Sequence, residues 1–326
     1  MSKLESFNEI SKIFGKDIII TERKNGDMIC KYKDHTGEGN MKIYQLFDGV
    51  QLIFNEFYMD SCYRKIDYNE DVITLNYCLK GRFECEFEDG TLVYIGEGDL
   101  AVNPLTNITT SSSFPKKEFI GVSIVIHKAL VSKSMNEKFS EYSIDFKKIL
   151  LKVHNNKCLV MRANKHALHI FLELYSICES VNLRMGYFKL KVLELMLFLC
   201  MDNDIIVDEK RKLYSKEQIQ IVKHIKSHLE EEHSKHITLD ELAKEHSIAK
   251  TTLKACFKDI YGISPYAYIR EYRMNIAAKM LKDTNMNITE IGTMLGYQNL
   301  SKFSKAFRDV YKYSPKDYQH EMTLWS

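Results

Sequence analysis

The chain lacks the features that mark membrane-spanning and exported proteins. Its 326 residues contain no run of about 18 apolar residues, the length that a bilayer-spanning helix needs. The densest apolar stretch, Leu190 to Met201, is short and is interrupted by Lys191 and Glu194. The first residues disperse their charges among polar side chains and show no signal-peptide pattern. We therefore expect a cytoplasmic protein that does not contact a membrane.

The sequence also lacks the motifs of common catalytic and metal sites. Its eight cysteines include no Cys-x-x-Cys pair, so we expect reduced, buried thiols. No Walker loop, dinucleotide fingerprint or nucleophile elbow is present. His224 and His228 are four residues apart, with His233, His236 and His246 nearby, but no cysteine or carboxylate completes a zinc-binding spacing. These absences predict a protein that is not an enzyme and that holds no metal or cofactor.

What the sequence does contain is one helix-turn-helix pattern written twice between residues 238 and 318. Each copy has an apolar anchor followed by a small residue, two apolar residues four apart, and a Ser-Pro-x-x-Tyr ending. The matching positions are Leu242-Ala243, Leu253, Phe257, Ser264-Pro265 and Tyr268 in the first copy and Ile291-Gly292, Phe303, Phe307, Ser314-Pro315 and Tyr318 in the second. Residues four apart share one helix face, so these apolar pairs are expected to point into the core.

Both copies open with a helix-start pattern. Thr238 precedes Glu241 in the first copy and Asn287 precedes Glu290 in the second, which is the spacing of a capping box. Between the copies, residues 266–282 show apolar side chains at helical spacing. The sequence therefore predicts two short capped helices, joined by one continuous helix that fixes the separation of the two copies.

The second helix of each copy carries short polar and cationic side chains on its outward face. Such side chains on an exposed helix can enter the major groove, hydrogen-bond to base edges and neutralise phosphates. The alternative is an ordinary solvated helix face, which the internal repeat disfavours. The residues predicted to contact DNA are Lys250, Thr251, Lys254 and Ala255 in the first copy and Leu300, Ser301, Lys302, Ser304 and Lys305 in the second. Of these, we assign Lys250 and Lys302 to phosphates.

With these motifs, residues 215–318 resemble the C-terminal DNA-binding domain of the AraC/XylS family of bacterial transcription regulators. The resemblance implies binding to double-stranded DNA, with each monomer contacting two major-groove segments about one helical turn apart. It further implies RNA polymerase as a possible partner and activation as the commoner outcome.

Three positions depart from the family pattern. Ala249 stands where the first recognition helix normally has a capping Ser. The missing cap is expected to cost about 1 kcal/mol of helix stability. Ser247 is expected to replace this cap only imperfectly. Gly292 replaces the usual Ala, and Lys312 stands where Gly is expected, as at Gly262 in the first copy. We expect these changes to lower local stability and the specificity for the first half-site without abolishing the fold.

The N-terminal half shows short alternating segments that are typical of antiparallel strands. The expected strands are residues 42–47, 50–59, 73–79, 82–88, 91–95 and 119–126. Such a set predicts a jelly roll or barrel, and residues 81–103 resemble the cupin-type sensor domain of AraC-family proteins. Cupin enzymes need a His-x-His pair, but the strand-rich residues 1–128 contain only His35 and His127. The expected barrel would therefore hold a small molecule, whose binding residues the sequence does not identify, or serve as a scaffold.

Two helical segments with wide apolar faces follow, at residues 162–180 and 187–201. Their apolar area exceeds what one helix needs to dock on a barrel, which favours a partner surface. The resemblance to the AraC/XylS family implies that these helices make a homodimer contact, formed by Leu168, Phe171, Leu172, Tyr175, Leu193, Met196 and Leu197. The segment from Tyr187 to Met196 is also similar to one in the pyochelin-regulator-like subgroup of the family, which responds to siderophores.

The predicted fold is α+β, with a cupin-like β-barrel sensor at residues 1–160 and a helical dimerisation element at 161–201. A charged linker at 202–214 then leads to an all-α double helix-turn-helix domain at 215–326. The predicted function is an effector-responsive transcription activator. Two alternatives are a ligand-independent regulator whose barrel binds another protein and, more remotely, a cupin enzyme with a DNA-binding appendage.

Overall fold

The computed structural model describes residues 18–22, 27–61, 72–88, 90, 92–104, 109–127, 130–131, 139, 141–145, 148–149, 158–177, 184–201, 207–210, 214–284 and 286–324. The chain divides into two compact units, Met1–Leu213 and Tyr214–Ser326. We describe each unit by itself. Within the described residues, no helix combines the length and the apolar character needed to cross a membrane.

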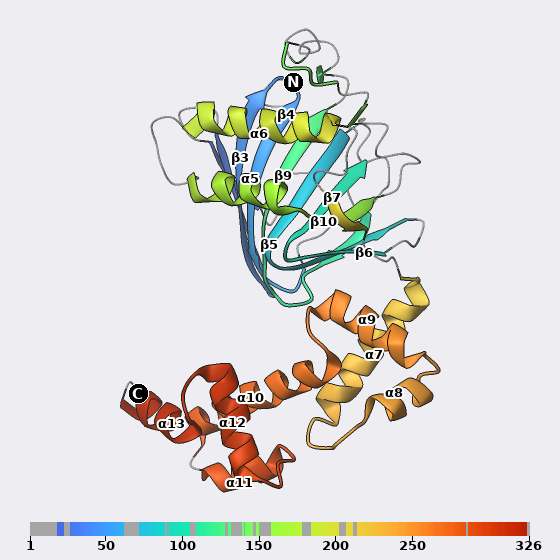
Figure 1. The fold of residues 1–326 in the computed structure, drawn as a ribbon. Helices are drawn as coiled ribbons and strands as arrows, with labels where there is room; N and C mark the ends of the chain where they lie inside the picture. Colours follow the sequence, from blue (N-terminus) through green and yellow to red (C-terminus); the bar gives the residue numbers. More distant parts are fainter. Residues whose placement is uncertain are drawn as a thin grey trace. The chain divides into compact units, whose positions relative to one another are not determined.

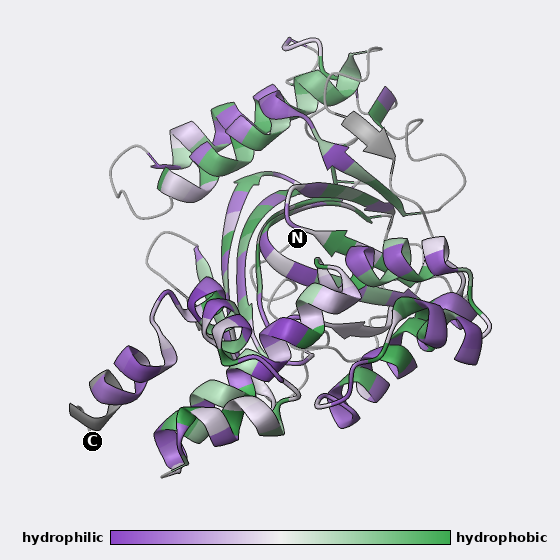
Figure 2. Cartoon of the chain, turned by 60° about the horizontal axis from the view of Figure 1, so that its bottom comes forward, coloured by the Kyte–Doolittle hydropathy of each residue, from purple (hydrophilic) through white to green (hydrophobic). Residues whose placement is uncertain are grey.

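The N-terminal unit is built on antiparallel strands (Figure 1). The strands are β1 (Ile18–Glu22), β2 (Met28–Asp34), β3 (Gly37–Phe47), β4 (Val50–Tyr58), β5 (Val72–Phe87), β6 (Leu92–Gly96), β7 (Asp99–Pro104), β8 (Thr109–Ser113), β9 (Phe119–His127), β10 (Leu159–Ala163) and β11 (Val207–Lys210). Their hydrogen-bonded order is β1-β2-β3-β4-β9-β5-β7-β10-β11, with β6 and β8 pairing with β5. Hydrophilic and hydrophobic residues alternate along the strands (Figure 2), as expected for strands with two different faces.

The sheet is open rather than closed, which corrects the predicted cupin-like barrel. Among the described strands, the path runs from β1 at one edge to β11 at the other. The two strands predicted at 73–79 and 82–88 are one long strand, β5, whose first part pairs with β9 and β7 and whose second part pairs with β6 and β8. Gly81 allows the change of direction with φ of +82°, and a Cβ there would lie 2.0 Å from the carbonyl oxygen of Glu118. A bend at glycine therefore divides this strand between two sheets.

Two helices, α5 (Lys165–Ser176) and α6 (Arg184–Cys200), cover one face of the sheet (Figure 1). Aromatic side chains fill this interface: the rings of Tyr77 and Phe171 stack with centroids 4.4 Å apart, and Phe188 lies 5.4 Å from Phe54. The opposite face holds a second apolar cluster, in which Phe57 and Phe114 stack at 5.1 Å. The aromatic residues of this unit are thus largely core residues.

The residues predicted for a dimer contact divide into three groups. Phe171 and Met196 are fully buried against the sheet, so their burial does not support a role in an external contact. Tyr175, Leu193 and Leu197 are partly buried and pack on the same core. Leu168 and Leu172 are 38% and 48% exposed. An apolar face remains on α5, but it is narrower than the sequence indicates, because most of the apolar area packs on the sheet.

Part of the predicted linker at 202–214 is ordered. Residues Val207–Lys210 form β11, which pairs with β10 and extends the sheet. Residues 202–206 and 211–213 lie outside the described residues.

The C-terminal unit contains helices whose order repeats. They are α7 (Lys216–Glu231), α8 (Leu239–Glu245), α9 (Lys250–Tyr261), α10 (Pro265–Asp283), α11 (Ile288–Met294), α12 (Leu300–Tyr311) and α13 (Pro315–Leu324). We call α8 with α9 the first reading head and α11 with α12 the second reading head. The predicted continuous helix between them is confirmed as α10. These helices carry hydrophilic and hydrophobic bands (Figure 2), so one side of each can pack while the other remains exposed.

Candidate nucleic-acid interface

The first helix of each reading head starts with the predicted capping box. In α8, the Thr238 hydroxyl accepts the Glu241 backbone N–H at 3.2 Å, and the Glu241 carboxylate accepts the Thr238 N–H at 2.7 Å. In α11, Asn287 and Glu290 make the same reciprocal pair at 2.9 and 2.8 Å. Each box satisfies two backbone donors that a helix start leaves open. The caps therefore fix where both short helices begin.

An aromatic triad closes each copy of the repeat. In the first, Phe257 lies 4.7 Å from Tyr261 and 5.6 Å from Tyr268, with 5.6 Å between the two tyrosine rings. The second triad is formed by Phe307, Tyr311 and Tyr318, with the corresponding separations of 4.9, 5.4 and 5.2 Å. The two copies thus share their packing as well as their sequence. Tyr261 and Tyr311 were missing from the sequence prediction, although both follow the central Phe by four residues.

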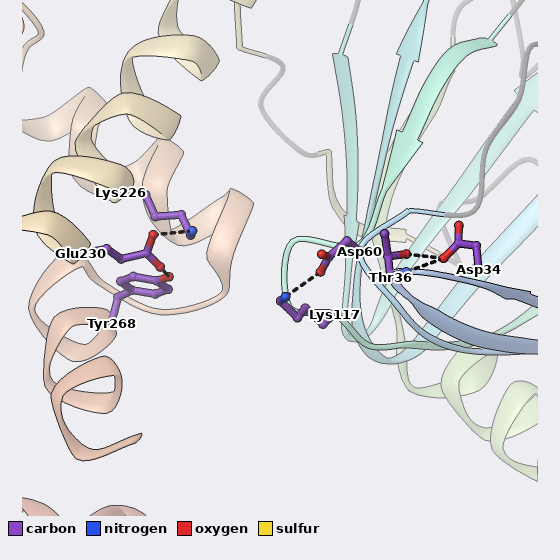
Figure 3. Close-up of polar contacts among 7 residues, drawn as sticks. All are labelled: Asp34, Thr36, Asp60, Lys117, Lys226, Glu230 and Tyr268. Atoms are coloured by element: carbon purple, nitrogen blue, oxygen red, sulfur yellow. Dashed lines mark hydrogen bonds and ion pairs between the residues drawn. The ribbon is translucent and has the colours of Figure 1, made fainter. Parts of the chain in front are cut away.

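The tyrosine that ends the first copy also joins two helices. Tyr268 on α10 donates a hydrogen bond to Glu230 on α7, and Lys226 pairs with the same carboxylate at 2.9 Å (Figure 3). Burial, together with this hydrogen bond, raises the pKa of the Tyr268 hydroxyl above its usual range. The hydroxyl therefore stays protonated and remains a donor, which holds α10 against α7 next to the first reading head.

The residues predicted to contact DNA lie on the outer faces of α9 and α12. Eight of them are exposed: Lys250, Thr251, Lys254, Ala255, Leu300, Ser301, Lys302 and Lys305. Ser304 is half-buried. On the inner faces, Leu253, Phe257, Phe303 and Phe307 are fully buried, which agrees with their predicted core positions. Both helices therefore present polar and cationic side chains outward over an apolar core.

The N-termini of these two helices differ. Asn299 caps α12, because its side chain accepts the backbone N–H groups of Ser301 and Lys302 at 2.9 and 3.2 Å. Ala249 occupies the same place before α9 and makes no side-chain cap. Ser247 does not replace that cap; it lies in the turn with a left-handed φ of +52°. The predicted absence of a side-chain cap at the start of α9 is confirmed, and the resulting loss of stability stays a prediction.

One predicted phosphate ligand already has a partner. Lys250, the first residue of α9, forms an exposed ion pair with Asp240 of α8 at 2.7 Å. No local pattern in the sequence indicates this pair, because ten residues and a turn separate its members. Asp240 therefore competes with any anion that approaches Lys250.

Arg273 on α10 connects the two reading heads. Its guanidinium donates to the backbone oxygens of His233 and Lys235, the latter at 2.9 Å, in the loop before α8. It also lies 5.8 Å from the ring centroid of Tyr297, in the turn before α12. Next to it, a Cβ at Gly296 would lie 2.0 Å from the Ser234 carbonyl oxygen. This close approach and the arginine join the loop before α8 to the turn before α12, and no sequence motif indicated either.

Residues 242–321 match the family described as "Helix-turn-helix domain". A putative AraC-like transcription regulator of Streptomyces lividans is 32% identical over 87 residues, which cover 27% of this chain and 29% of the relative. The lactose operon transcription activator of Staphylococcus xylosus is 30% identical over 103 residues, covering 32% of this chain and 37% of the relative. The C-terminal unit is an AraC-type helix-turn-helix domain. The matches thus span less than half the length of these two relatives.

Among solved structures, the C-terminal domain of AraT, a response regulator from Geobacillus stearothermophilus, is 28% identical. It covers 31% of this chain and 84% of that one, with a TM-score of 0.30.

The AraC-type domain accommodates the two remaining departures from the family pattern. A Cβ at Gly292 would lie 3.2 Å from the Leu300 side chain and 3.4 Å from Phe303, so Gly allows α11 and α12 to approach closely. Lys312 ends α12 with φ of +66°, where Gly262 ends α9 with φ of +83°. Lys312, which stands where Gly is expected, thus has a left-handed conformation, and such a φ is mildly strained for a residue with a Cβ.

Proposed function

We propose that this chain is a sequence-specific, DNA-binding transcription regulator that works in the cytoplasm. The observation that carries the proposal is the repeated construction of the C-terminal unit: two capped helix pairs, each with its own aromatic triad, present α9 and α12 with outward polar and cationic faces. A helix of this kind fits the major groove. Two such helices, joined through the continuous helix α10, can contact two major-groove segments of one DNA duplex.

We assign the contacts by chemistry. Lys250 and Lys302 at the first turns neutralise phosphates. The base-facing residues are Thr251, Lys254, Ser301, Ser304 and Lys305. Ala255 offers only contact with a thymine methyl, whereas Lys305 and its serine neighbours can hydrogen-bond. The second reading head should therefore discriminate more strongly than the first. Replacing Lys305 by Ala is expected to cost more sequence discrimination than replacing Lys254, as measured on DNA with mutated half-sites; the reverse ranking would contradict this assignment.

For the N-terminal unit we propose an effector-binding and dimerising role. A small molecule bound there would change promoter occupancy or the recruitment of RNA polymerase, with activation as the outcome. The supporting observation for a dimer is the apolar face on α5, where Leu168 and Leu172 remain exposed. A small molecule can shift the regulator between two conformational states only if it binds those states with different affinities. The alternative is a ligand-independent regulator whose N-terminal unit binds only protein, which would show no thermal shift with any small molecule.

The test is quantitative binding of the full chain to DNA from upstream of its own and neighbouring genes. Binding is measured at two salt concentrations, with and without candidate small molecules including siderophores. Tight, sequence-selective binding that weakens steeply with salt and shifts with one compound would support the proposal for both units. Weak, non-selective binding under all conditions would count against it.

A further inference from the structure

Three side chains of metal-binding type meet beside the first reading head. His228 lies in the last turn of α7, Glu245 is the last residue of α8, and His246 follows as its C-cap. One potential ligand atom from each lies within 4.8 Å of the other two. His228 Nδ1 is 3.7 Å from a Glu245 carboxylate oxygen, and the rings of His228 and His246 are 5.9 Å apart.

A second observation points to a ligand at this place. The Nε2 atom of His246 is buried and makes no hydrogen bond among the described residues. Leaving such a buried polar atom without a partner destabilises the fold, and coordination of a metal ion by this atom would remove that cost. Two imidazoles and a carboxylate form a ligand set that zinc uses in proteins, with a water in the fourth position. The cluster thus combines suitable chemistry with an unmet demand for a partner.

We propose that His228, Glu245 and His246 bind one divalent metal ion of the zinc type. In tetrahedral zinc sites the ligand atoms lie about 3.4 Å apart, so the side chains must close by roughly an ångström. His228 and Glu245 can rotate to do so, because their side chains are 24% and 56% exposed. The sequence predicts no metal here, because the carboxylate is not at a regular spacing from the histidines. The fold brings α7 and α8 together and places Glu245 beside both histidines.

The position of the site suggests what the metal does. The chain leaves α8 at His246, passes through Ser247 and enters α9 at the uncapped Ala249. A metal that ties α7 to the end of α8 holds the residues leading into the first recognition helix. Metal binding should therefore stabilise the first reading head and raise its affinity for DNA. This consequence rests on the proposed DNA-binding function, whereas the site itself does not.

The experiment uses the full chain, without an affinity tag and stripped of metal with a chelator. Zinc binding is measured by calorimetry, and the coordination geometry by the visible absorption of bound Co²⁺. We expect one metal ion per chain. Affinity should fall by more than about tenfold in His228→Gln and in His246→Gln, and remain unchanged in His236→Ala, since that exposed histidine lies outside the cluster.

No zinc binding at neutral pH, or binding that both glutamine variants retain, would overturn the proposed site. Thermal unfolding without metal checks that the variants fold. If a histidine variant does not fold, Glu245→Gln, which alters an exposed side chain, takes its place in the binding measurement. DNA binding is then compared with and without zinc. Zinc binding that leaves affinity for the first half-site unchanged would overturn the regulatory consequence. Failure to bind DNA at all would count against the proposed function and leave the metal site standing.

Discussion

At the residue scale, the missing cap at Ala249 offers a direct gain in stability. Ala249 has φ of −62° and ψ of 133°, an extended conformation in which a Ser hydroxyl can accept a backbone N–H of the first turn. Ala249→Ser should stabilise the start of α9 by about 1 kcal/mol. Hydrogen exchange in the full chain should then slow about fivefold at residues 251–253.

The matched control for this change is Asn299→Ala in the second reading head. It removes the cap of α12 and should speed exchange at the start of that helix by a similar factor. Equal amide exchange rates at these helix starts in the wild type and both variants would show that the caps do not limit local opening.

Buried cysteines should be unreactive in the folded protein. Burial raises the pKa of Cys30 to about 11 and that of Cys85 to about 12, so little reactive thiolate forms at neutral pH. Iodoacetamide should label the cysteines at 30, 78, 85, 158, 200 and 256 only after unfolding. Mass spectrometry reads the labelled positions. Rapid labelling of Cys85 in native protein would contradict its buried position.

A buried ion pair fastens α6 to the start of β2. Arg184 contacts Asp27 at 2.7 Å, with side chains only 12% and 7% exposed, and it also lies 4.9 Å from the ring centroid of Tyr44. Arg184→Met leaves the carboxylate uncompensated and should lower the free energy of unfolding by about 3–5 kcal/mol. Urea unfolding of the full chain measures the loss. Adding Asp27→Asn should recover part of it; no recovery would mean that lost packing dominates.

At the element scale, an ion-pair network joins α5 to α6. Lys191 contacts Glu173 at 2.5 Å and Glu194 at 2.9 Å. Burial by itself lowers the pKa of Lys191, but hydrogen bonds to the two carboxylates raise it above its usual value. The hydrogen bond from Lys191 in turn lowers the pKa of Glu173 below 4.5. The carboxylate therefore contributes stability that is present above pH 4.5 and lost as pH falls through its lowered pKa.

Acid titration tests this link. The midpoint of urea unfolding of the N-terminal unit should fall below pH 4.5 in the wild type. In Glu173→Gln the midpoint should be lower at neutral pH and should change less with acid. An identical pH profile for both proteins would exclude a contribution from this pair.

Arg273 should control how the two reading heads match their half-sites. Arg273→Ala removes its contacts with the loop before α8 and with Tyr297 before α12, so the distance between α9 and α12 should become less fixed. We expect a smaller affinity difference between DNA targets whose half-sites differ in spacing by one base pair. Lys279→Ala, an exposed change on the same helix, should leave that difference intact. The same spacing preference in Arg273→Ala would contradict the positioning role.

At the scale of the whole molecule, the sequence predicted the C-terminal unit much better than the N-terminal one. Caps, turns and helix faces depend on residues a few positions apart, so Thr238 with Glu241 and Leu253 with Phe257 were readable directly. The N-terminal strands pair over long separations. Their alternation indicated strands, but not that β5 bends at Gly81 and serves two sheets.

The same distinction separates the predicted and missed parts of the candidate site. Exposure of α9 and α12 follows from helical periodicity. The partner of Lys250, the bridge through Arg273 and the carboxylate beside His228 come from tertiary packing, which joins helices across turns and loops. No local pattern contains those contacts.

The ion pair between Lys250 and Asp240 also affects how many ions DNA binding releases. A free lysine that meets a phosphate frees about one counterion from the duplex. Lys250 must first leave Asp240, whose carboxylate then attracts a cation from solution. The exchange therefore releases almost no ions overall, and the logarithm of the binding constant should fall less steeply with salt than the number of phosphate contacts implies. Asp240→Asn should restore about one unit of that slope, so salt dependence measures whether the aspartate holds the lysine until DNA arrives.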